Sequence, residues 1–142
     1  MKLESKLNFN LVSPERLLFS AEVDMVTVPG EEGDMGILPG HAPVLSTLRA
    51  GLIDVYQEGS SAATQHFFVA DGFASIDDSG CTVLAEEAVP LAELEETSLE
   101  KRVEEMKEHL GMARTEDEKK SVRTDLTLTY AKLEIIKRLR KK

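Results

Sequence analysis

The sequence predicts an all-β N-terminal sandwich followed by a C-terminal α-helical hairpin. Up to residue 89, short apolar segments alternate with turn-forming residues, which is typical of a β-sandwich or barrel. No useful run with helical periodicity occurs before Pro90, and beyond it apolar residues recur every three to five positions. These observations divide the chain into a β domain, residues 1–89, and a two-helix domain, residues 90–142.

The first expected strand covers residues 7–11, where three apolar residues alternate with asparagines, as in a half-buried strand. Turn formers then separate most of the segments that follow, among them Pro-Gly, Glu-Gly-Ser, Asp-Gly and Asp-Asp-Ser-Gly. The other expected strands cover residues 22–28, 36–38, 44–45, 51–56, 66–70, 73–76 and 81–84.

Two amphipathic helices are expected in the second domain. The apolar stripe of the first consists of Leu91, Leu94, Leu99, Val103, Met106 and Leu110. Thr97 or Ser98 is the expected N-cap of this helix, and Gly111 is its expected end. The stripe of the second consists of Val122, Leu126, Tyr130, Leu133, Ile136 and Leu139. Residues 115–118, Thr-Glu-Asp-Glu, predict its N-terminus, so the two helices form a hairpin.

The charge is unevenly distributed. The formal net charge of −9 at pH 7 argues against a general binder of nucleic acids or anionic membranes. From Lys119 onward, however, nine Lys and Arg residues are accompanied only by Asp125 and Glu134. This basic end indicates either a binding site for a partner or a solvated helix end whose cations favour the helix dipole, and both remain open.

Cysteine usage and hydropathy bear on the compartment. Cys81 is the single cysteine, which excludes an internal disulfide and fits a reducing environment. It lies in an apolar run and is expected to be a buried residue rather than a reactive thiol. The N-terminal residues have no continuous apolar segment, and no stretch reaches the ~18 apolar residues of a membrane span. We expect the protein on the cytoplasmic side of a membrane.

Residue patterns for catalysis are weak. His41, His66 and His109 have no spacing that would make a metal site, and no phosphate-binding loop or nucleophile motif is present. Paired carboxylates such as Glu31 and Glu32 in a turn-rich segment are usually solvated. We therefore expect no catalytic residue, no metal and no cofactor.

Residues 28–43, Val-Pro-Gly-Glu-Glu-Gly-Asp-Met-Gly-Ile-Leu-Pro-Gly-His-Ala-Pro, are rich in glycine, proline and acids. Their glycines and prolines predict an ordered excursion between strands that displays Glu31, Glu32 and Asp34 near His41. The segment is either a polar turn or a docking surface.

Specific motifs run through the β domain. They are Val12-Ser-Pro14, Phe19-Ser20, Gly36-Ile-Leu-Pro-Gly-His-Ala-Pro43 and Val69-Ala-Asp-Gly-Phe73. In these motifs the chain resembles the ε subunit of bacterial F-type ATP synthase, the counterpart of the mitochondrial δ subunit. The resemblance implies a sandwich of about ten strands and a non-catalytic rotor subunit of the central stalk. Such a subunit couples rotation of the c ring to ATP synthesis in the catalytic head, restrains ATP hydrolysis and lies peripherally at the cytoplasmic face of the plasma (inner) membrane.

The resemblance also implies binding sites. Glu32, Asp34 and His41 would face the c ring and the foot of the γ subunit, and γ would dock on an exposed apolar patch of the sandwich. The basic end would meet an acidic segment of the β subunit in the head of α and β subunits, or would stay in water. Its candidate residues are Lys132, Lys137, Arg138 and Arg140.

Relatives that bind ATP begin the first helix of this region with an Ile/Leu-Asp-x-x-Arg-Ala pattern. Here Glu95 keeps the acid, but Ser98 stands where the arginine would be, which argues against ATP binding.

Two other functions remain as alternatives. The chain could be an independent binding module that captures an acidic partner with its helices, or a small hydrolase that uses the acidic loop. A rotor subunit should co-purify with γ and the c ring, whereas a hydrolase should lose activity on Asp34→Asn. If the chain is a rotor subunit, deletion from Pro90 onward should leave assembly and ATP synthesis largely intact and raise ATP hydrolysis.

Overall fold

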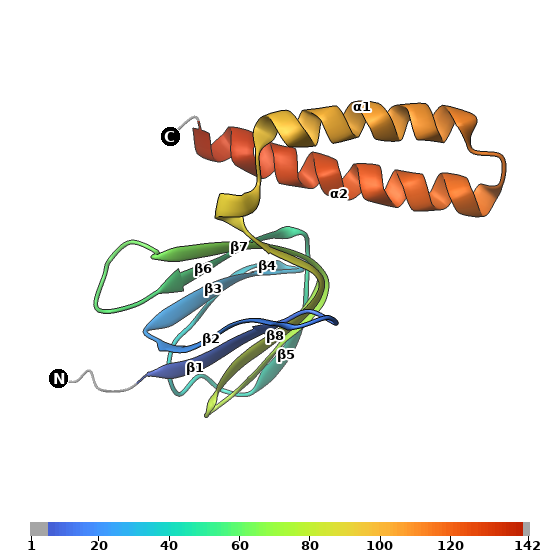
Figure 1. Ribbon diagram of the computed structural model, residues 1–142. Coiled ribbons are helices and arrows are strands. Elements are labelled where there is room, and N and C mark those ends of the chain that lie inside the picture. The colour runs from blue at the N-terminus through green and yellow to red at the C-terminus, as the bar shows by residue number, and fades with distance from the viewer. Residues whose placement is uncertain (1–5, 141–142) are drawn as a thin grey trace. The chain divides into compact units, whose positions relative to one another are not determined.

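Figure 1 shows the computed structural model of the chain, which describes residues 6–140. The chain divides into two compact units, Met1–Leu91 and Ala92–Lys142. In the described residues, the first unit is built of eight strands and the second of two long helices. The strands are β1 Leu7–Val12, β2 Leu17–Val23, β3 Met25–Gly30, β4 Gly33–Ile37, β5 Val44–Leu48, β6 Gly51–Tyr56, β7 Gln65–Asp77 and β8 Gly80–Pro90.

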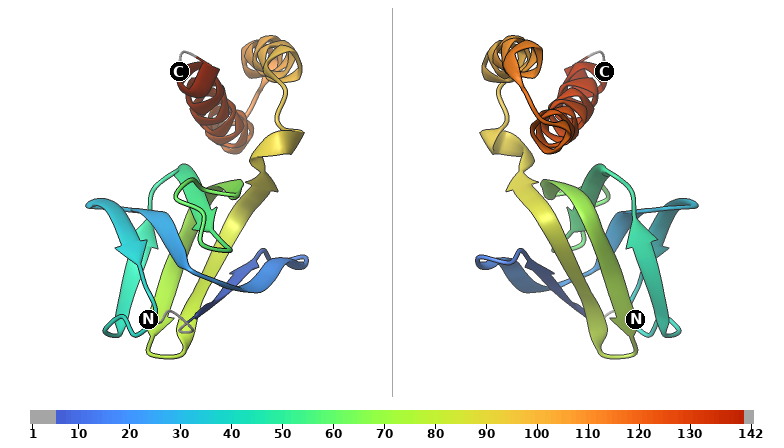
Figure 2. Two further views of the ribbon diagram at one scale, coloured as in Figure 1. Left: turned by 90° about the vertical axis from the view of Figure 1, so that its left-hand side faces the viewer. Right: turned by 90° about the vertical axis from the view of Figure 1, so that its right-hand side faces the viewer.

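The strands form a sandwich of two layers that share β7 and β8. One layer has the order β2-β1-β8-β7-β5, and in it β8 runs parallel to β1. In the other layer β4, β3 and β6 are neighbours, and β6 pairs with the first half of β7. Figure 2 shows β7 and β8 running side by side along the sandwich, which agrees with their long antiparallel register. The predicted fold class, a β-sandwich followed by a helical hairpin, is thus confirmed.

β7 passes from one layer to the other at Asp71 and Gly72. It pairs with β6 up to Val69 and with β5 from Gly72 onward, and Asp71 has a φ of 57°. A Cβ at Gly72 would lie 2.1 Å from the carbonyl oxygen of Leu84, so only glycine fits this close approach. The pattern predicts separate strands at 66–70 and 73–76, whereas the bend leaves one continuous strand. The described residues form eight strands, whereas the resemblance implies about ten.

The expected strand at 22–28 is divided at Asp24 into the end of β2 and the start of β3. Asp24 forms a bend between the two strands. Its N–H donates to the carbonyl oxygen of Tyr56, and its carboxylate accepts from the Gly59 N–H at 2.7 Å. Lys6 also pairs with this carboxylate, and these donors hold the pKa of Asp24 below its usual value.

The core of the first unit lies between the two layers. Alternate residues of β1 and β6 point into it, and its largest side chains are less than 2% exposed. Burying these side chains on both layers gives the sandwich its main stabilisation. The fully buried large residues include Leu7, Phe9, Leu11, Val23, Val26, Val28, Ile37, Ile53, Val55, Val69 and Val83.

The second unit contains α1, Glu96–Met112, and α2, Glu116–Arg140, after a short 3-10 turn η1, Leu91–Glu93. Leu99 and Val103 of α1 are buried with Leu133 of α2 in the core of this hairpin. Outside that core, Arg102 pairs with Asp125 at 2.6 Å between the two helices. The apolar stripes thus pack against each other as amphipathic helices require.

The N-cap expected for α1 is wrong. Glu95 is the cap residue, with extended φ and ψ of −120° and 128°, while Thr97 and Ser98 already lie in the first helical turn. The helix also continues past Gly111 to Met112. At α2 the prediction is confirmed: the Thr115 hydroxyl accepts from the Glu118 N–H at 3.1 Å, and the Glu118 carboxylate accepts from the Thr115 N–H at 3.0 Å.

The two units meet in sequence after Leu91, whereas the sequence pattern places the boundary after Val89. β8 continues through Pro90, which is the last residue of the strand and lies opposite Phe67. A proline is tolerated there because the end of a strand does not need its N–H for the ladder.

Candidate docking surfaces

The acidic segment forms the tip of the β3-β4 hairpin. Gly30 and Gly33 are directly opposite each other, and Glu31 and Glu32 form the turn between them. Gly33 has a φ of +144°, which side chains rarely adopt, and a Cβ at Gly30 would lie 2.6 Å from the Gly33 carbonyl oxygen. The two glycines therefore make the tight turn possible and leave the two glutamates exposed.

A surface hollow of about 380 Å³ lies beside this tip. Its rim carries the acids of the hairpin, and Met35 and Leu45 add an apolar part. The lining residues are Gly30, Glu31, Glu32, Gly33, Asp34, Met35, Leu45, Ser46 and Thr47. The hairpin tip and β5 thus form one surface.

Two of the three residues predicted to dock, Glu32 and Asp34, come together here. Asp34, however, is engaged by Arg49, whose Nη2 donates to its Oδ1 at 2.5 Å. His41 lies on the loop after β4 and is not among the residues that line the hollow. Its N–H donates to the carbonyl oxygen of Leu38 at 3.2 Å, and its Nδ1 lies 2.7 Å from the Ala42 carbonyl oxygen. The histidine thus holds its own loop and does not join the acidic tip.

A row of apolar side chains crosses the outer face of the β2-β1-β8-β7-β5 layer. Phe73 lies opposite Leu84, Leu84 opposite Val12, and Val12 opposite Leu17. Leu17, Phe73 and Leu84 are 57%, 42% and 43% exposed, and Leu45 on β5 is 70% exposed. Scattered apolar residues on a surface are normal, but a contiguous row across four strands indicates an interface. We call Leu17, Val12, Leu84 and Phe73 the apolar row; on β5, Thr47 lies opposite Phe73, and Leu45 lies opposite Ser75.

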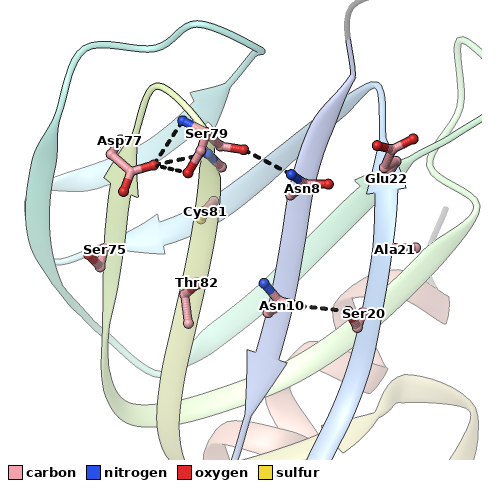
Figure 3. Close-up of a pocket in the computed structure, with 11 residues that line it drawn as sticks. Asn8, Asn10, Ser20, Ala21, Glu22, Ser75, Asp77, Ser79, Cys81 and Thr82 are labelled. Atoms are coloured by element: carbon pink, nitrogen blue, oxygen red, sulfur yellow. Dashed lines mark hydrogen bonds between the residues drawn. The ribbon is translucent and has the colours of Figure 1, made fainter.

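A polar row runs beside the apolar row on the same face. Ser75, Thr82, Asn10 and Ser20 follow one another across β7, β8, β1 and β2. They line a surface hollow of about 500 Å³, which Figure 3 shows in close-up. The Ser20 hydroxyl donates to the Asn10 side-chain oxygen at 2.6 Å. The outer face therefore changes from apolar to hydrogen-bonding side chains within two residues along β7, β8 and β1.

The apolar row leaves a partial signal in the sequence. In the predicted strands 73–76 and 81–84, Phe73 and Leu84 stand on the parity opposite to Ile76 and Val83, so alternation alone places them on the outer face. Their arrangement as one row depends on register, which the pattern does not give.

The basic end of α2 is partly engaged within the hairpin. Lys137 lies 3.9 Å from the Glu100 carboxylate of α1, and the Arg138 side chain is exposed. Lys132 is half-buried and takes part in an interaction. Arg140 ends the helix, and its side chain lies outside the described part of the structure. Ser98 stands where the ATP-binding pattern has an arginine. Its hydroxyl donates to the Glu95 carboxylate at 3.0 Å.

Side chains with potentially reactive groups are either buried or held by hydrogen bonds within the fold. His66 Nδ1 lies 2.7 Å from the Asp54 carboxylate on the neighbouring strand. Burial raises the pKa of the Cys81 thiol to about 12, so it is protonated at neutral pH. Asp77 accepts from the N–H groups of Ser79 and Gly80 and from the Ser79 hydroxyl, which lowers its pKa. Among residues 6–140 no group of His, Cys, Asp and Glu side chains is arranged to hold a metal.

Neither helix of the described residues is long and apolar enough to cross a membrane.

Comparisons with known proteins agree with this architecture. Residues 6–91 match the family described as ATP synthase, Delta/Epsilon chain, beta-sandwich domain. The ATP synthase epsilon chain of Parvibaculum lavamentivorans is 53% identical over 119 residues, which cover 84% of this chain and 89% of the relative. That of Rhodospirillum centenum is 45% identical over 137 residues, which cover 94% of each chain.

Among solved structures, a chain of the Euglena gracilis mitochondrial ATP synthase, determined as OSCP/F1/c-ring, is similar with a TM-score of 0.71. It is 25% identical, and the match covers 98% of this chain and 84% of that one. A chain from the central stalk and c ring of the Tetrahymena thermophila enzyme shares the fold, with a TM-score of 0.52 and 14% identity. With the β-sandwich, the helical hairpin and these similarities together, the chain belongs to the ATP synthase Delta/Epsilon chain family.

Proposed function

We propose that the chain works in the central stalk as a coupling element with two docking surfaces, the apolar row and the acidic β3-β4 tip. As a member of its family it is a non-catalytic subunit of ATP synthase, and the complex is the enzyme. The single observation that carries the proposal is the exposed apolar row across hydrogen-bonded strands of one layer. The hydrolase alternative has no such support.

The apolar row is the proposed seat of the γ subunit. A rotor part must pass torque to its neighbour, which requires a broad contact on a stiff support. Strands locked in a ladder provide that support, and the polar row beside Phe73 and Leu84 would supply a hydrogen-bonding rim. The expected patch is therefore present on the sandwich, and γ is its proposed occupant.

The β3-β4 tip is the proposed contact with the c ring. Its exposed Glu31 and Glu32 offer negative charge to the polar, cation-bearing loops that c subunits turn toward the stalk. Each such exposed ion pair contributes modest energy, but together they set where the partner docks and select a partner of positive charge. Their attraction weakens as the salt concentration rises. His41 remains part of the proposed surface through its loop, although it is not beside the tip.

The basic end of α2 is the proposed contact with an acidic segment of the β subunit in the catalytic head of α and β subunits. Arg138 is exposed and Lys137 pairs only loosely with Glu100, at 3.9 Å. Coulomb attraction to a more acidic partner could replace that pairing. Ser98 donates a hydrogen bond to Glu95 and has no guanidinium that could pair with phosphates. This supports a hairpin that does not bind ATP.

The proposed location follows from these partners. The chain would lie at the cytoplasmic face of the membrane and associate with it only through γ and the c ring.

Co-purification tests this function. The full chain with an affinity tag, expressed in a cell whose own copy is deleted, should recover γ and the c ring from detergent-solubilised membranes. A chain ending at Leu91, the boundary of the first unit, should recover both as well. Absence of γ and of c-ring subunits from both preparations would contradict the proposal.

The role of the second unit is tested with the same two chains. ATP hydrolysis by the membranes should rise with the chain ending at Leu91 if the hairpin acts as a brake. Unchanged hydrolysis would assign the brake to another component.

A further inference from the structure

Arg49 lies just beyond β5 and reaches back to the β3-β4 tip. Its backbone N–H donates to the carbonyl oxygen of Pro29 at 2.9 Å. Its Nη1 donates to the carbonyl oxygen of Gly30 and its Nη2 to the carboxylate of Asp34, both at 2.5 Å. One side chain therefore holds the last residue of β3 and the second residue of β4.

The two acceptors lie on either side of the Glu31-Glu32 turn. Gly30 pairs with Gly33, and Asp34 pairs with Pro29. The Glu31 N–H, at the start of the turn, donates to the carbonyl oxygen of Thr47 on β5 at 2.9 Å. The turn is thus fastened to the end of β5 by main-chain bonds and, across its base, by one guanidinium.

The geometry suits an arginine in particular. A guanidinium presents several donors in a fixed plane, so it can serve a carbonyl oxygen and a carboxylate at the same time. A lysine has one nitrogen at the end of a flexible stem and would serve one of the two acceptors well. Asp34 is 72% and Arg49 45% exposed, so neither residue is required for the core.

The pairing also separates the roles of the acids at the tip. Asp34 is compensated by Arg49, while Glu31 and Glu32 form the exposed turn. A partner with positive loops would therefore meet the two turn carboxylates in a fixed position. Fixing them before contact lowers the ordering cost that docking has to overcome.

We propose that Arg49 is a positioning residue for the docking tip: it anchors Asp34 and Gly30 so that Glu31 and Glu32 are presented in one orientation. The inference deepens the proposed function and rests on the tip being a docking surface. It makes Asp34 an anchor, in contrast to the direct docking role that the sequence suggests for it.

A first experiment measures the anchoring in the isolated full chain. Amide hydrogen exchange at Glu31 and Glu32 is followed by NMR in the wild type, Arg49→Gln, Arg49→Lys and Asp34→Asn. Arg16→Gln is the matched control, because Arg16 is an exposed arginine in another turn of the same unit. We expect exchange of the Glu31 amide to rise about three- to tenfold in Arg49→Gln and less in Arg49→Lys, with the control unchanged.

Unchanged exchange in Arg49→Gln would overturn the proposal. If Arg49→Gln fails to fold, Arg49→Lys and Asp34→Asn decide the question, since lysine would serve one of the two acceptors and asparagine keeps an acceptor oxygen without the charge. Unchanged exchange in both variants would likewise overturn the proposal.

A second experiment measures docking with the same variants. Each full chain is added back to ATP synthase depleted of this subunit, and its affinity is measured by titration. We expect Arg49→Gln and Asp34→Asn to weaken binding about three- to tenfold, with Arg49→Lys in between. Glu31→Gln and Glu32→Gln should weaken binding while leaving the exchange of the tip unchanged.

The two experiments distinguish the possible failures. Faster exchange with unchanged binding in every tip variant would mean that the tip is not a docking surface, so the proposed function of the tip fails while the anchor stands. Weaker binding with unchanged exchange would mean that Arg49 contacts the partner itself, and the positioning role fails.

Discussion

Leu84 of β8 lies directly opposite Phe73 of β7, and both side chains are exposed on the outer face of the sandwich. Neighbouring strands extend this pair to Val12 and Leu17. Water-exposed apolar side chains in register across strands contribute little to folding, because they are not buried in the monomer. Their effect should instead be seen in assembly.

The double variant Phe73→Ser and Leu84→Ser tests this surface. We expect it to fold with a melting temperature close to the wild type and to bind the γ subunit roughly 10- to 100-fold more weakly. Affinity for the purified γ subunit, measured by calorimetry, gives the result. Met112→Ser is the control, because Met112 is equally apolar and 68% exposed but lies in the second unit. Equal affinity of the double variant and the wild type would remove the apolar row from the docking surface.

Gly72→Ala tests the bend between the two layers. The added Cβ would lie 2.1 Å from the Leu84 carbonyl oxygen and 2.7 Å from the Ala85 Cα, so the backbones of β7 and β8 would have to separate. We expect a loss on the order of 2 to 4 kcal/mol in the free energy of unfolding, measured with urea.

Gly36→Ala is the control in the same sandwich, because its Cβ would meet only the Met25 sulfur at 3.9 Å. It should change the free energy of unfolding by less than about 1 kcal/mol. Similar losses in the two variants would contradict the steric argument.

Glu118 should make the stability of the hairpin depend on pH. Its carboxylate accepts from the backbone N–H groups of Arg114 and Thr115, and these bonds hold its pKa below the ordinary value of 4.5. The unfolded chain therefore binds the proton more readily than the folded one. The stabilisation is complete above pH 4.5 and is lost as the pH falls through the lowered pKa of the folded state.

The measurement is the melting temperature of the helical signal in circular dichroism between about pH 5 and pH 3. At about pH 5, Glu118→Gln should have a lower melting temperature than the wild type. On acidification, its melting temperature should fall less than that of the wild type. Glu105→Gln, an exposed glutamate of α1, is the control for the change in charge. A Glu118→Gln curve parallel to that of the wild type would show that the cap does not titrate with folding.

Apolar packing should contribute more to the stability of the hairpin than its ion pairs do. Leu99 is 8% exposed and packs with Val103 and Leu133, so Leu99→Ala should cost about 2 to 4 kcal/mol of hairpin stability. Arg102 and Asp125 pair at 2.6 Å, but the arginine side chain is 50% exposed, so Arg102→Gln should cost less than about 1 kcal/mol. Urea unfolding followed by the helical signal compares them. A larger loss from Arg102→Gln would reverse this ranking.

The sequence alone determined the fold class, because alternation and helical periodicity are local consequences of which face of an element is buried. The helical stripes through Leu99 and Leu133 and the capping box of Thr115 and Glu118 could be found in this way. The family was also within reach, since the run from Gly36 to Pro43 is specific. The acids of the docking tip were found by their composition.

Only the tertiary structure decided how these pieces combine. The row of Leu17, Val12, Leu84 and Phe73 depends on strand register, and the anchor of Asp34 by Arg49 joins residues fifteen positions apart. The structure also places His41 outside the hollow beside the tip and makes β7 one continuous strand. Local pattern reports burial but not which strand lies beside which, because pairing is fixed by the whole core at once.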